Sequence, residues 1–250
     1  MQHNLAPDII FYLLGFPFSN TLISTLIVDV VLLGLVLIAA RNVKMLPGKL
    51  QAGIELILSY FYDLTQQIAG NRVKVIFPWV ASFFIFIFFS NLLGLLPGVG
   101  TIGILYPGEH GNEIMPILRP ATSDFNVTLA LALISFVATH VIAIRINGLK
   151  GYASHFFNFS SLYLAPIFLF VGLLEIVSEF VKLFSLSFRL FGNIFAGEVV
   201  LSTITSIFAF VAPVPFLMLE SVVAIVQALV FAMLTMAFMS ALSAQPSEEH

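Results

Sequence analysis

Apolar runs longer than the core helices of a small soluble protein constrain this chain most. They occupy 19–40, 73–96 and 125–146, and each exceeds about 20 residues, the length that an α-helix needs to cross a bilayer. Only 9% of the residues are charged, whereas a soluble domain carries about 25% to cover its surface. We therefore predict an all-α polytopic membrane protein, with three spanning helices in these runs.

The segment 50–69 differs from these runs because it mixes polar with apolar residues. Apolar side chains recur at Ile54, Leu58, Phe61 and Leu64, a spacing that places them on one side of a helix. Such an amphipathic helix can lie on the membrane surface or pack against other helices, and both interpretations stay open. We do not expect it to cross the membrane.

Basic residues indicate the orientation of the chain. Lys and Arg follow the first span, precede the second and follow the third, whereas the N-terminal tail and the loop at 97–124 hold only Arg119. The positive-inside rule then places the N-terminus and this loop outside. No Lys or Arg precedes Arg41, which argues against a basic signal or transit peptide. We expect a bacterial plasma membrane, with the mitochondrial inner membrane as the alternative.

A further apolar stretch, 162–209, is too long for one perpendicular crossing. As a single helix its 48 residues would extend about 72 Å, against about 30 Å for the hydrocarbon core. The stretch therefore contains two crossings with a hidden break, or one helix lying far from the membrane normal. Pro213 and Pro215 predict a turn after it, and 216–243 forms a last long apolar segment.

These last two segments carry polar side chains that an apolar environment disfavours. One charge at the centre of a bilayer costs about 2.5–3.5 kcal/mol to insert, so such groups usually mark an ion or substrate path. The residues concerned are Glu175, Glu179, Lys182, Arg189, Asn193, Glu198, Glu220 and Gln227.

Helical geometry arranges these side chains. At about 100° per residue, the polar residues between 175 and 193 form one stripe. Glu198 lies on the opposite side from Arg189 and about 13.5 Å further along the helix. Arg189 has no acidic residue three or four positions away, so its partner must come from another segment or another chain. Glu220 and Gln227 share one face of the last segment.

Simpler interpretations apply to several polar residues. Glu179 and Lys182 are three residues apart and can neutralise each other without taking part in transport. Roles in an ion path, at an interface or in packing stay open for Asp29, Asp124, His140 and Glu175.

Several chemistries are not expected. The chain has no cysteine, so it can form no disulfide and no thiolate metal site. No two His residues lie at metal-ligand spacing, and no HExxH, GxSxG or P-loop motif occurs, so we expect no metal, cofactor or catalytic centre. The net charge of −3 argues against a nucleic-acid partner.

Four stretches of the sequence match the pattern of one known family. The most specific is SLSFRLFGNIFAGE at 185–198, and the others are NLLGLLP at 91–97, PATSDFNVTLAL at 120–131 and QALVFAMLTM at 227–236. Together they resemble subunit a of the F-type ATP synthases. The order of the stretches is that of the family, and the resemblance extends over nearly the whole chain after its first 18 residues.

The resemblance implies a fold and a site. The last two segments would form a long, steeply tilted helical hairpin that lines a rotor ring of c subunits. The family's essential arginine falls on Arg189, and its two proton-path positions fall on Glu198 and Glu220. Its asparagine and glutamine fall on Asn193 and Gln227. Bacterial relatives often have Glu and His at the two path positions, where this chain has two Glu.

The resemblance also implies a function and partners. The subunit would conduct protons through two offset aqueous half-channels that Arg189 separates, without being catalytic alone. Its partners would be the c-subunit rotor ring, b-type peripheral stalk subunits, membrane lipid and, indirectly, the F1 sector. The alternatives are a sodium-translocating version of this subunit, a secondary transporter in which Arg189 binds an anion, and a structural membrane scaffold.

Overall fold

A computed structural model gives the fold of the chain. It describes residues 7–13, 15–41, 47–96, 99, 103–108, 111–156, 165–208 and 213–244. Parts of the predicted segments lie outside these described residues: 97–98, 100–102 and 109–110 of the 97–124 loop, 162–164 and 209 of the 162–209 stretch, and the polar end 245–250.

The N-terminal half combines a small hairpin with three helices. Strands β1 (Ile9–Leu13) and β2 (Phe16–Ser19) pair antiparallel immediately before helix α1 (Asn20–Arg41). Helix α2 (Lys49–Ala69) then leads through one tight turn into α3 (Val73–Gly94). The sequence predicted no hairpin before the first span.

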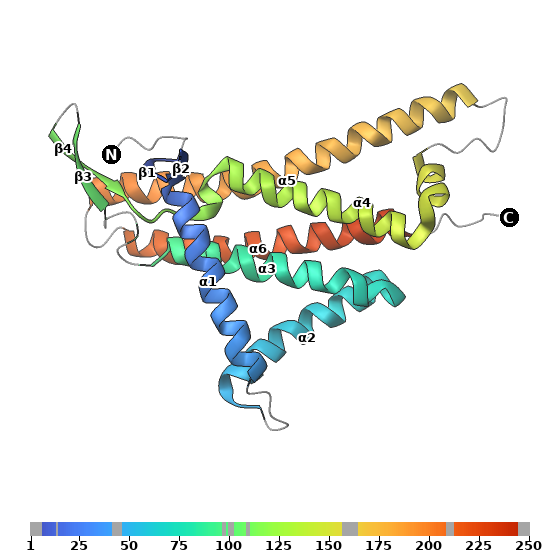
Figure 1. The fold of residues 1–250 in the computed structure, drawn as a ribbon, viewed down its shortest axis with the longest axis horizontal. Helices are drawn as coiled ribbons and strands as arrows, with labels where there is room; N and C mark the ends of the chain where they lie inside the picture. Colours follow the sequence, from blue (N-terminus) through green and yellow to red (C-terminus); the bar gives the residue numbers. More distant parts are fainter. Residues whose placement is uncertain are drawn as a thin grey trace.

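The middle of the chain begins with a second antiparallel hairpin, formed by β3 (Gly103–Gly108) and β4 (Gly111–Pro116). The short 3₁₀ helix η2 (Ala121–Ser123) follows, and then the long helix α4 (Phe125–Phe156). Gly148 interrupts α4 with a φ of 71°, a left-handed conformation that glycine adopts without steric cost. The last turns of α4 therefore change direction and turn away from its main part (Figure 1).

Two long helices complete the chain. Helix α5 (Ala165–Ile207) has 43 residues without an internal break, which corresponds to about 64 Å. Of the two possibilities for the 162–209 stretch, the structure therefore has one long helix. Helix α6 begins at Pro213 and ends at Ser243, so the two prolines lie in its first turn, where a missing N–H breaks no helical hydrogen bond.

Helices α3, α4, α5 and α6 run alongside one another and form the core (Figure 1). Ile87, Leu190 and Phe231 are nearly inaccessible in one core cluster. A second cluster includes Met236 and also Phe61 of α2. Helix α2 thus packs against α3 and α6, one of the two positions that its amphipathic pattern allowed.

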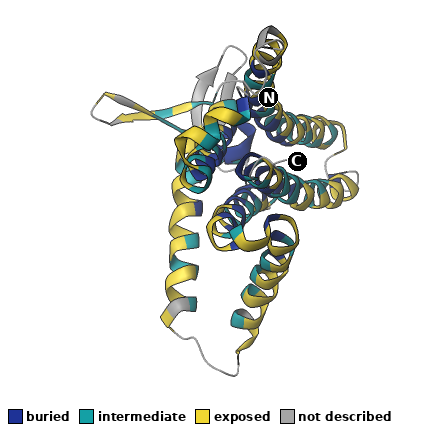
Figure 2. Cartoon of the chain, turned by 90° about the vertical axis from the view of Figure 1, so that its right-hand side faces the viewer, coloured by how far each residue is buried: buried dark blue, intermediate teal, exposed yellow. Residues whose placement is uncertain are grey.

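Helix α1 is attached to this bundle by its first turns only. Most of its length is exposed (Figure 2), and Val30, Leu33 and Val36 each expose more than 60% of their surface. Its apolar composition matches a lipid or protein environment and not water.

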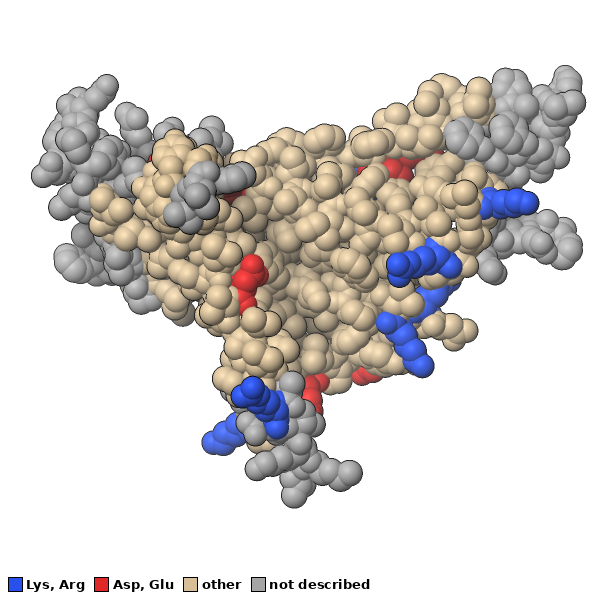
Figure 3. All heavy atoms as spheres, viewed as in Figure 1, with Lys and Arg blue, Asp and Glu red and all other residues tan. Residues whose placement is uncertain are grey.

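Four stretches of the described residues are long and apolar enough to cross a membrane: Asn20–Ala39, Gln51–Gly94, Phe125–Phe156 and Pro213–Ser243. The prediction of an all-α polytopic membrane protein is confirmed. Lys and Arg gather near the end of α1 and at the end of the bundle where α4 finishes, and they are almost absent from the apolar face between (Figure 3).

Candidate functional site

Arg189 lies on an exposed face near the middle of α5. It forms no hydrogen bond or ion pair with any residue that the structure describes. Beside it is a hollow of about 180 Å³, lined from α5 by Lys182 and Ser185 and from α6 by Phe238. Asn193, one turn further along, is also exposed. A permanently charged group thus stands at an open surface of α5, beside a hollow with both polar and apolar lining residues.

Glu198 lies on the other side of α5 and meets a cation from the loop. Arg119 Nε donates to both carboxylate oxygens of Glu198, at 3.1 and 3.2 Å. The Arg119 side chain is 6% exposed and that of Glu198 21%. The guanidinium also stands 6.0 Å from the ring centre of Phe195. The Coulomb attraction between two such partly buried charges is stronger than between the same charges in water.

Glu220 of α6 approaches α5 closely at a glycine, Gly197. Its carboxylate occupies the space that a Cβ would fill at Gly197. Gly197 directly precedes Glu198 in the sequence, so both carboxylates lie at one level of α5. Because only glycine leaves this space free, the Gly-Glu pair at 197–198 permits the close approach. We call Arg119, Glu198 and Glu220 the outer cluster.

Hydrogen bonds fix the loop segment that carries Arg119. The Arg119 N–H donates to Ser24 Oγ of α1 at 3.1 Å. Asn91 of α3 donates to the Ala224 carbonyl of α6 at 3.1 Å and accepts from Thr122 at 2.5 Å. These bonds connect η2 and its flanking residues to three helices, so Arg119 is held by a rigid frame.

Asp124 has a structural position at the beginning of α4. Its Oδ1 accepts from the Asn126 N–H at 2.9 Å, the geometry of a helix N-cap. Its Oδ2 accepts from Thr21 Oγ1 of α1, also at 2.9 Å. The side chain is therefore occupied in capping α4 and joining it to α1.

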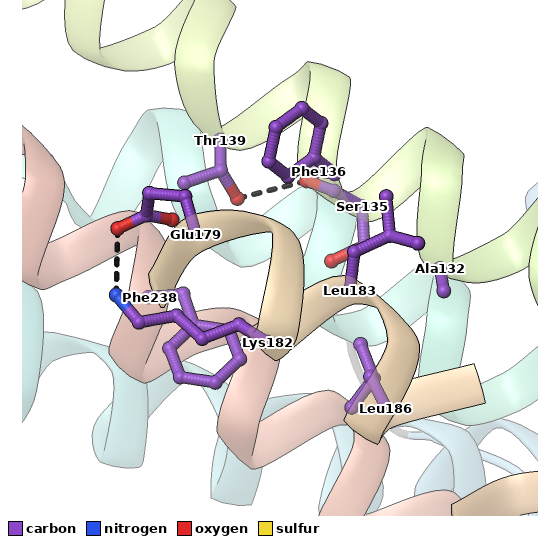
Figure 4. Close-up of a pocket in the computed structure, with 9 residues that line it drawn as sticks. All are labelled: Ala132, Ser135, Phe136, Thr139, Glu179, Lys182, Leu183, Leu186 and Phe238. Carbon is purple, nitrogen blue, oxygen red and sulfur yellow. Dashed lines mark hydrogen bonds and ion pairs between the residues drawn. The ribbon is translucent and has the colours of Figure 1, made fainter. Parts of the chain in front are cut away.

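A second group of polar residues lies beyond Arg189, toward the beginning of α5. Lys182 Nζ donates to Glu179 Oε1 at 2.6 Å, and the Glu179 side chain is 9% exposed. These two residues and Ser135 and Thr139 of α4 line a cavity of about 20 Å³ (Figure 4), which is room for about one water molecule. Because Lys182 also lines the hollow beside Arg189, it borders both spaces.

Two further pairs connect α4 with itself and with α5 near this cavity. His140 Nδ1 and the Tyr152 hydroxyl are 3.0 Å apart across the bend at Gly148. His140 Nε2 is buried and has no hydrogen-bond partner among the described residues. His155 Nε2 lies 3.2 Å from Glu175 Oε1. We call Glu179, Lys182, His140, Tyr152, Glu175 and His155 the inner cluster.

The structure brings some predicted site residues together and separates others. Glu220 lies against Gly197, the residue next to Glu198, so these two predicted residues are on neighbouring positions of the site. The predicted polar stripe is divided, because Glu179 is buried against α4 whereas Arg189 is exposed. The stripe spans about 80° of the helix surface, and α4 covers only one of its edges. Gln227 is half-buried on α6 and forms no hydrogen bond with Arg189 in the described part of the chain.

Arg119 is the site residue that sequence reasoning missed. The sequence did show it as the single basic residue of the 97–124 loop, next to a stretch with a family pattern. Its partner is 79 positions away, so no local spacing indicated the pair.

A family model described as ATP synthase A chain matches residues 22–240. This chain belongs to the ATP synthase A chain family. The match includes all of α1 except its first two residues, and all of α2 to α5. The β1–β2 hairpin lies outside it.

Individual members of the ATP synthase A chain family are similar in sequence to this chain over most of their length. The protein named ATP synthase subunit a from Moorella thermoacetica is 33% identical over 240 residues, which is 96% of this chain and 97% of that protein. The one from Syntrophobacter fumaroxidans is 34% identical over 215 residues, which is 86% of this chain and 80% of that protein. Membership of this family makes the chain an integral membrane protein of the ATP synthesis and ion transport machinery.

Proposed function

We propose that this chain is the stator subunit a of an F0 sector, in which Arg189 separates two proton half-channels and couples proton flow to rotation of a c-subunit ring. The observation that carries the proposal is the position of Arg189, exposed and unpaired within the described residues, between two groups of ionisable side chains. An exposed arginine on an apolar membrane face needs an acidic partner from outside the chain, and a rotor carboxylate supplies one.

The outer cluster is the entry route in this proposal. Glu220 and Glu198 can each accept and release a proton, whereas an arginine cannot, because its guanidinium stays charged. Arg119 holds Glu198 in place through its two contacts. Glu220, which lacks such a partner among the described residues, is then the carboxylate better suited to transfer protons toward the ring.

The inner cluster is the release route. The hollow beside Arg189 and the small cavity at Glu179 share Lys182 in their lining, so polar groups follow one another along α5 from the arginine toward its N-terminal half. Asn193 and Gln227 flank the arginine and can orient water or a rotor carboxylate without titrating. Glu175 and His140 lie further along the same route.

The energetics suit this arrangement. Each proton that crosses 100 mV releases about 2.3 kcal/mol. That energy is available for rotation only if the proton cannot pass directly between the two routes. The positive charge of Arg189 repels a proton at that point and favours ionisation of the carboxylate that faces it. No catalysis in this subunit is needed.

The proposed surroundings follow from the same features. The c ring covers the exposed α5–α6 face around Arg189, b-type stalk subunits and lipid cover other apolar surface, and the F1 sector acts indirectly. The basic ends of the helices face the cytoplasm, which places the N-terminus outside. The membrane is a bacterial plasma membrane.

The test is ATP-driven proton pumping in vesicles that contain the assembled complex. Arg189→Ala should abolish pumping while the complex still assembles, and it should permit passive proton leak. Val200→Ala, a change at an exposed apolar position of the same helix, serves as the control and should pump normally. Normal pumping by Arg189→Ala would refute the proposed role. Pumping that depends on sodium instead of protons would favour the sodium-translocating alternative.

A further inference from the structure

An unpaired carboxylate lies in the middle of helix α1. Asp29 is exposed and forms no hydrogen bond or ion pair with any residue in the described ranges. It lies nine residues from Asn20 and twelve from Arg41, which are about 13.5 and 18 Å along the helix. At this depth of a spanning helix, an ionisable group normally faces a partner or a water-filled path.

Asp29 interrupts a regular apolar seam. Leu22, Leu26, Leu33 and Val36 are exposed and, together with Asp29, follow one another at steps of four, three, four and three residues. Steps of three and four are the pattern by which one helix packs along another. A single polar residue within such a seam fixes the alignment of the two helices.

The seam faces away from the chain's own bundle. The opposite side of α1 carries the buried residues Asn20, Thr21, Ser24 and Val28. Thr21 donates to Asp124, and Ser24 accepts from the N–H of Arg119. Since these contacts fix the rotation of α1, the described helices of the chain cannot reach Asp29.

We propose that the seam of α1 binds one membrane-spanning helix of a different polypeptide, which presents a lysine, an arginine or another hydrogen-bond donor opposite Asp29. Lipid is a poor occupant, because aspartate is too short to reach the interface as lysine and arginine do. A second copy of α1 is also a poor occupant, because two Asp29 carboxylates would repel each other. Charge complementarity therefore selects a basic or donor-bearing helix.

The inference concerns neither Arg189 nor the two clusters. If it fails, the proposed function is unaffected, and if the arginine test fails, the seam remains. The two outcomes are separable because the first experiment measures pumping and this one measures which membrane subunits stay bound.

The experiment uses the assembled complex, purified by a tag on another subunit, with each membrane subunit quantified by mass spectrometry. Asp29→Lys should lower the retention of one helix-bearing partner at least tenfold, and Asp29→Leu should lower it less. Asp29→Asn, which keeps a hydrogen-bonding side chain, should retain it. The matched control is Val30→Lys, which places the same charge about 100° around the helix, off the seam. This control should retain the partner.

A charge swap identifies the contact. Replacing the membrane-embedded Lys or Arg of the lost partner by Asp should restore its retention by Asp29→Lys. Wild-type retention of every membrane subunit by both Asp29→Lys and Asp29→Leu would overturn the proposal, since the seam would then face lipid. The chain has no cysteine, so Asp29→Cys introduces a unique thiol. A disulfide between two copies of this variant would also overturn the proposal.

Discussion

Replacing Gly197 by alanine tests whether this glycine is needed for the position of the Glu220 side chain. A Cβ at Gly197 would coincide with the Glu220 carboxylate, so that side chain must move. Alanine in a helix interior is worth about 0.5–1 kcal/mol more than glycine. The displaced carboxylate is the far end of a flexible side chain, so overpacking should cost about 1 kcal/mol, the lower end of its usual range. The gain and the cost nearly cancel, and Gly197→Ala should be neutral or mildly destabilising.

Gly53→Ala is the matched control. Gly53 lies in helix α2, and nothing stands within 4 Å of a Cβ built there, so this variant should keep the full gain of about 0.5–1 kcal/mol. Unfolding of the purified chain in detergent, followed by circular dichroism, measures the difference. The two variants should differ by about 1 kcal/mol, the lower end of the cost of overpacking.

The functional effect should exceed the effect on stability. A displacement of about 1 Å at a reacting group can lower a rate by up to 100-fold, so proton flux through vesicles should fall at least about tenfold in Gly197→Ala. Adding Glu220→Asp shortens the side chain and should recover stability but not flux. The reasoning is refuted if Gly197→Ala is as stable as Gly53→Ala and conducts protons like the wild type.

Two other changes test the frame around the site by the same unfolding measurement. Arg119→Met leaves Glu198 without its buried cation and should cost about 3 kcal/mol, near the low end for broken buried pairs because Glu198 keeps 21% exposure. The double variant Arg119→Met, Glu198→Leu should recover most of that loss, and additive costs would contradict a direct pair. Asp124→Ala removes the cap of α4 and should cost about 1–2 kcal/mol. Asp63→Ala, at an exposed position of α2, should stay within about 0.5 kcal/mol of wild type, and an equal effect of both changes would speak against the capping role.

The sequence predicted the class of fold because hydrophobic length is a local property. The apolar runs at 19–40 and 125–146 predict membrane helices without any information on the tertiary contacts of the chain. The hairpin β1–β2 was not predicted, since its strands have only five and four residues. Strands this short depend on their pairing and give a weak periodic signal.

The candidate site was predictable only as far as one helix extends. Helical spacing correctly separated Arg189 from the side of α5 that carries Glu198. It could not indicate that Arg119 would meet Glu198, because this contact joins a loop to a distant helix. Nor could it tell that α4 would cover Glu179, or that the bend at Gly148 would bring Tyr152 back to His140. These contacts depend on tertiary packing.

The unbroken length of α5 makes its sequence intolerant of insertions and deletions. One continuous helix sets the relative positions of the outer cluster, Arg189 and the inner cluster. In it every residue adds a rise of about 1.5 Å and a rotation of about 100°. One extra residue between Arg189 and Glu198 would rotate one part of α5 relative to the other by about 100°. Either Glu198 would then lose its contact with Arg119, or Arg189 would leave its exposed face. A substitution within α5 should therefore be tolerated more readily than a change in its length, whereas the connections between helices can change in length without moving these groups.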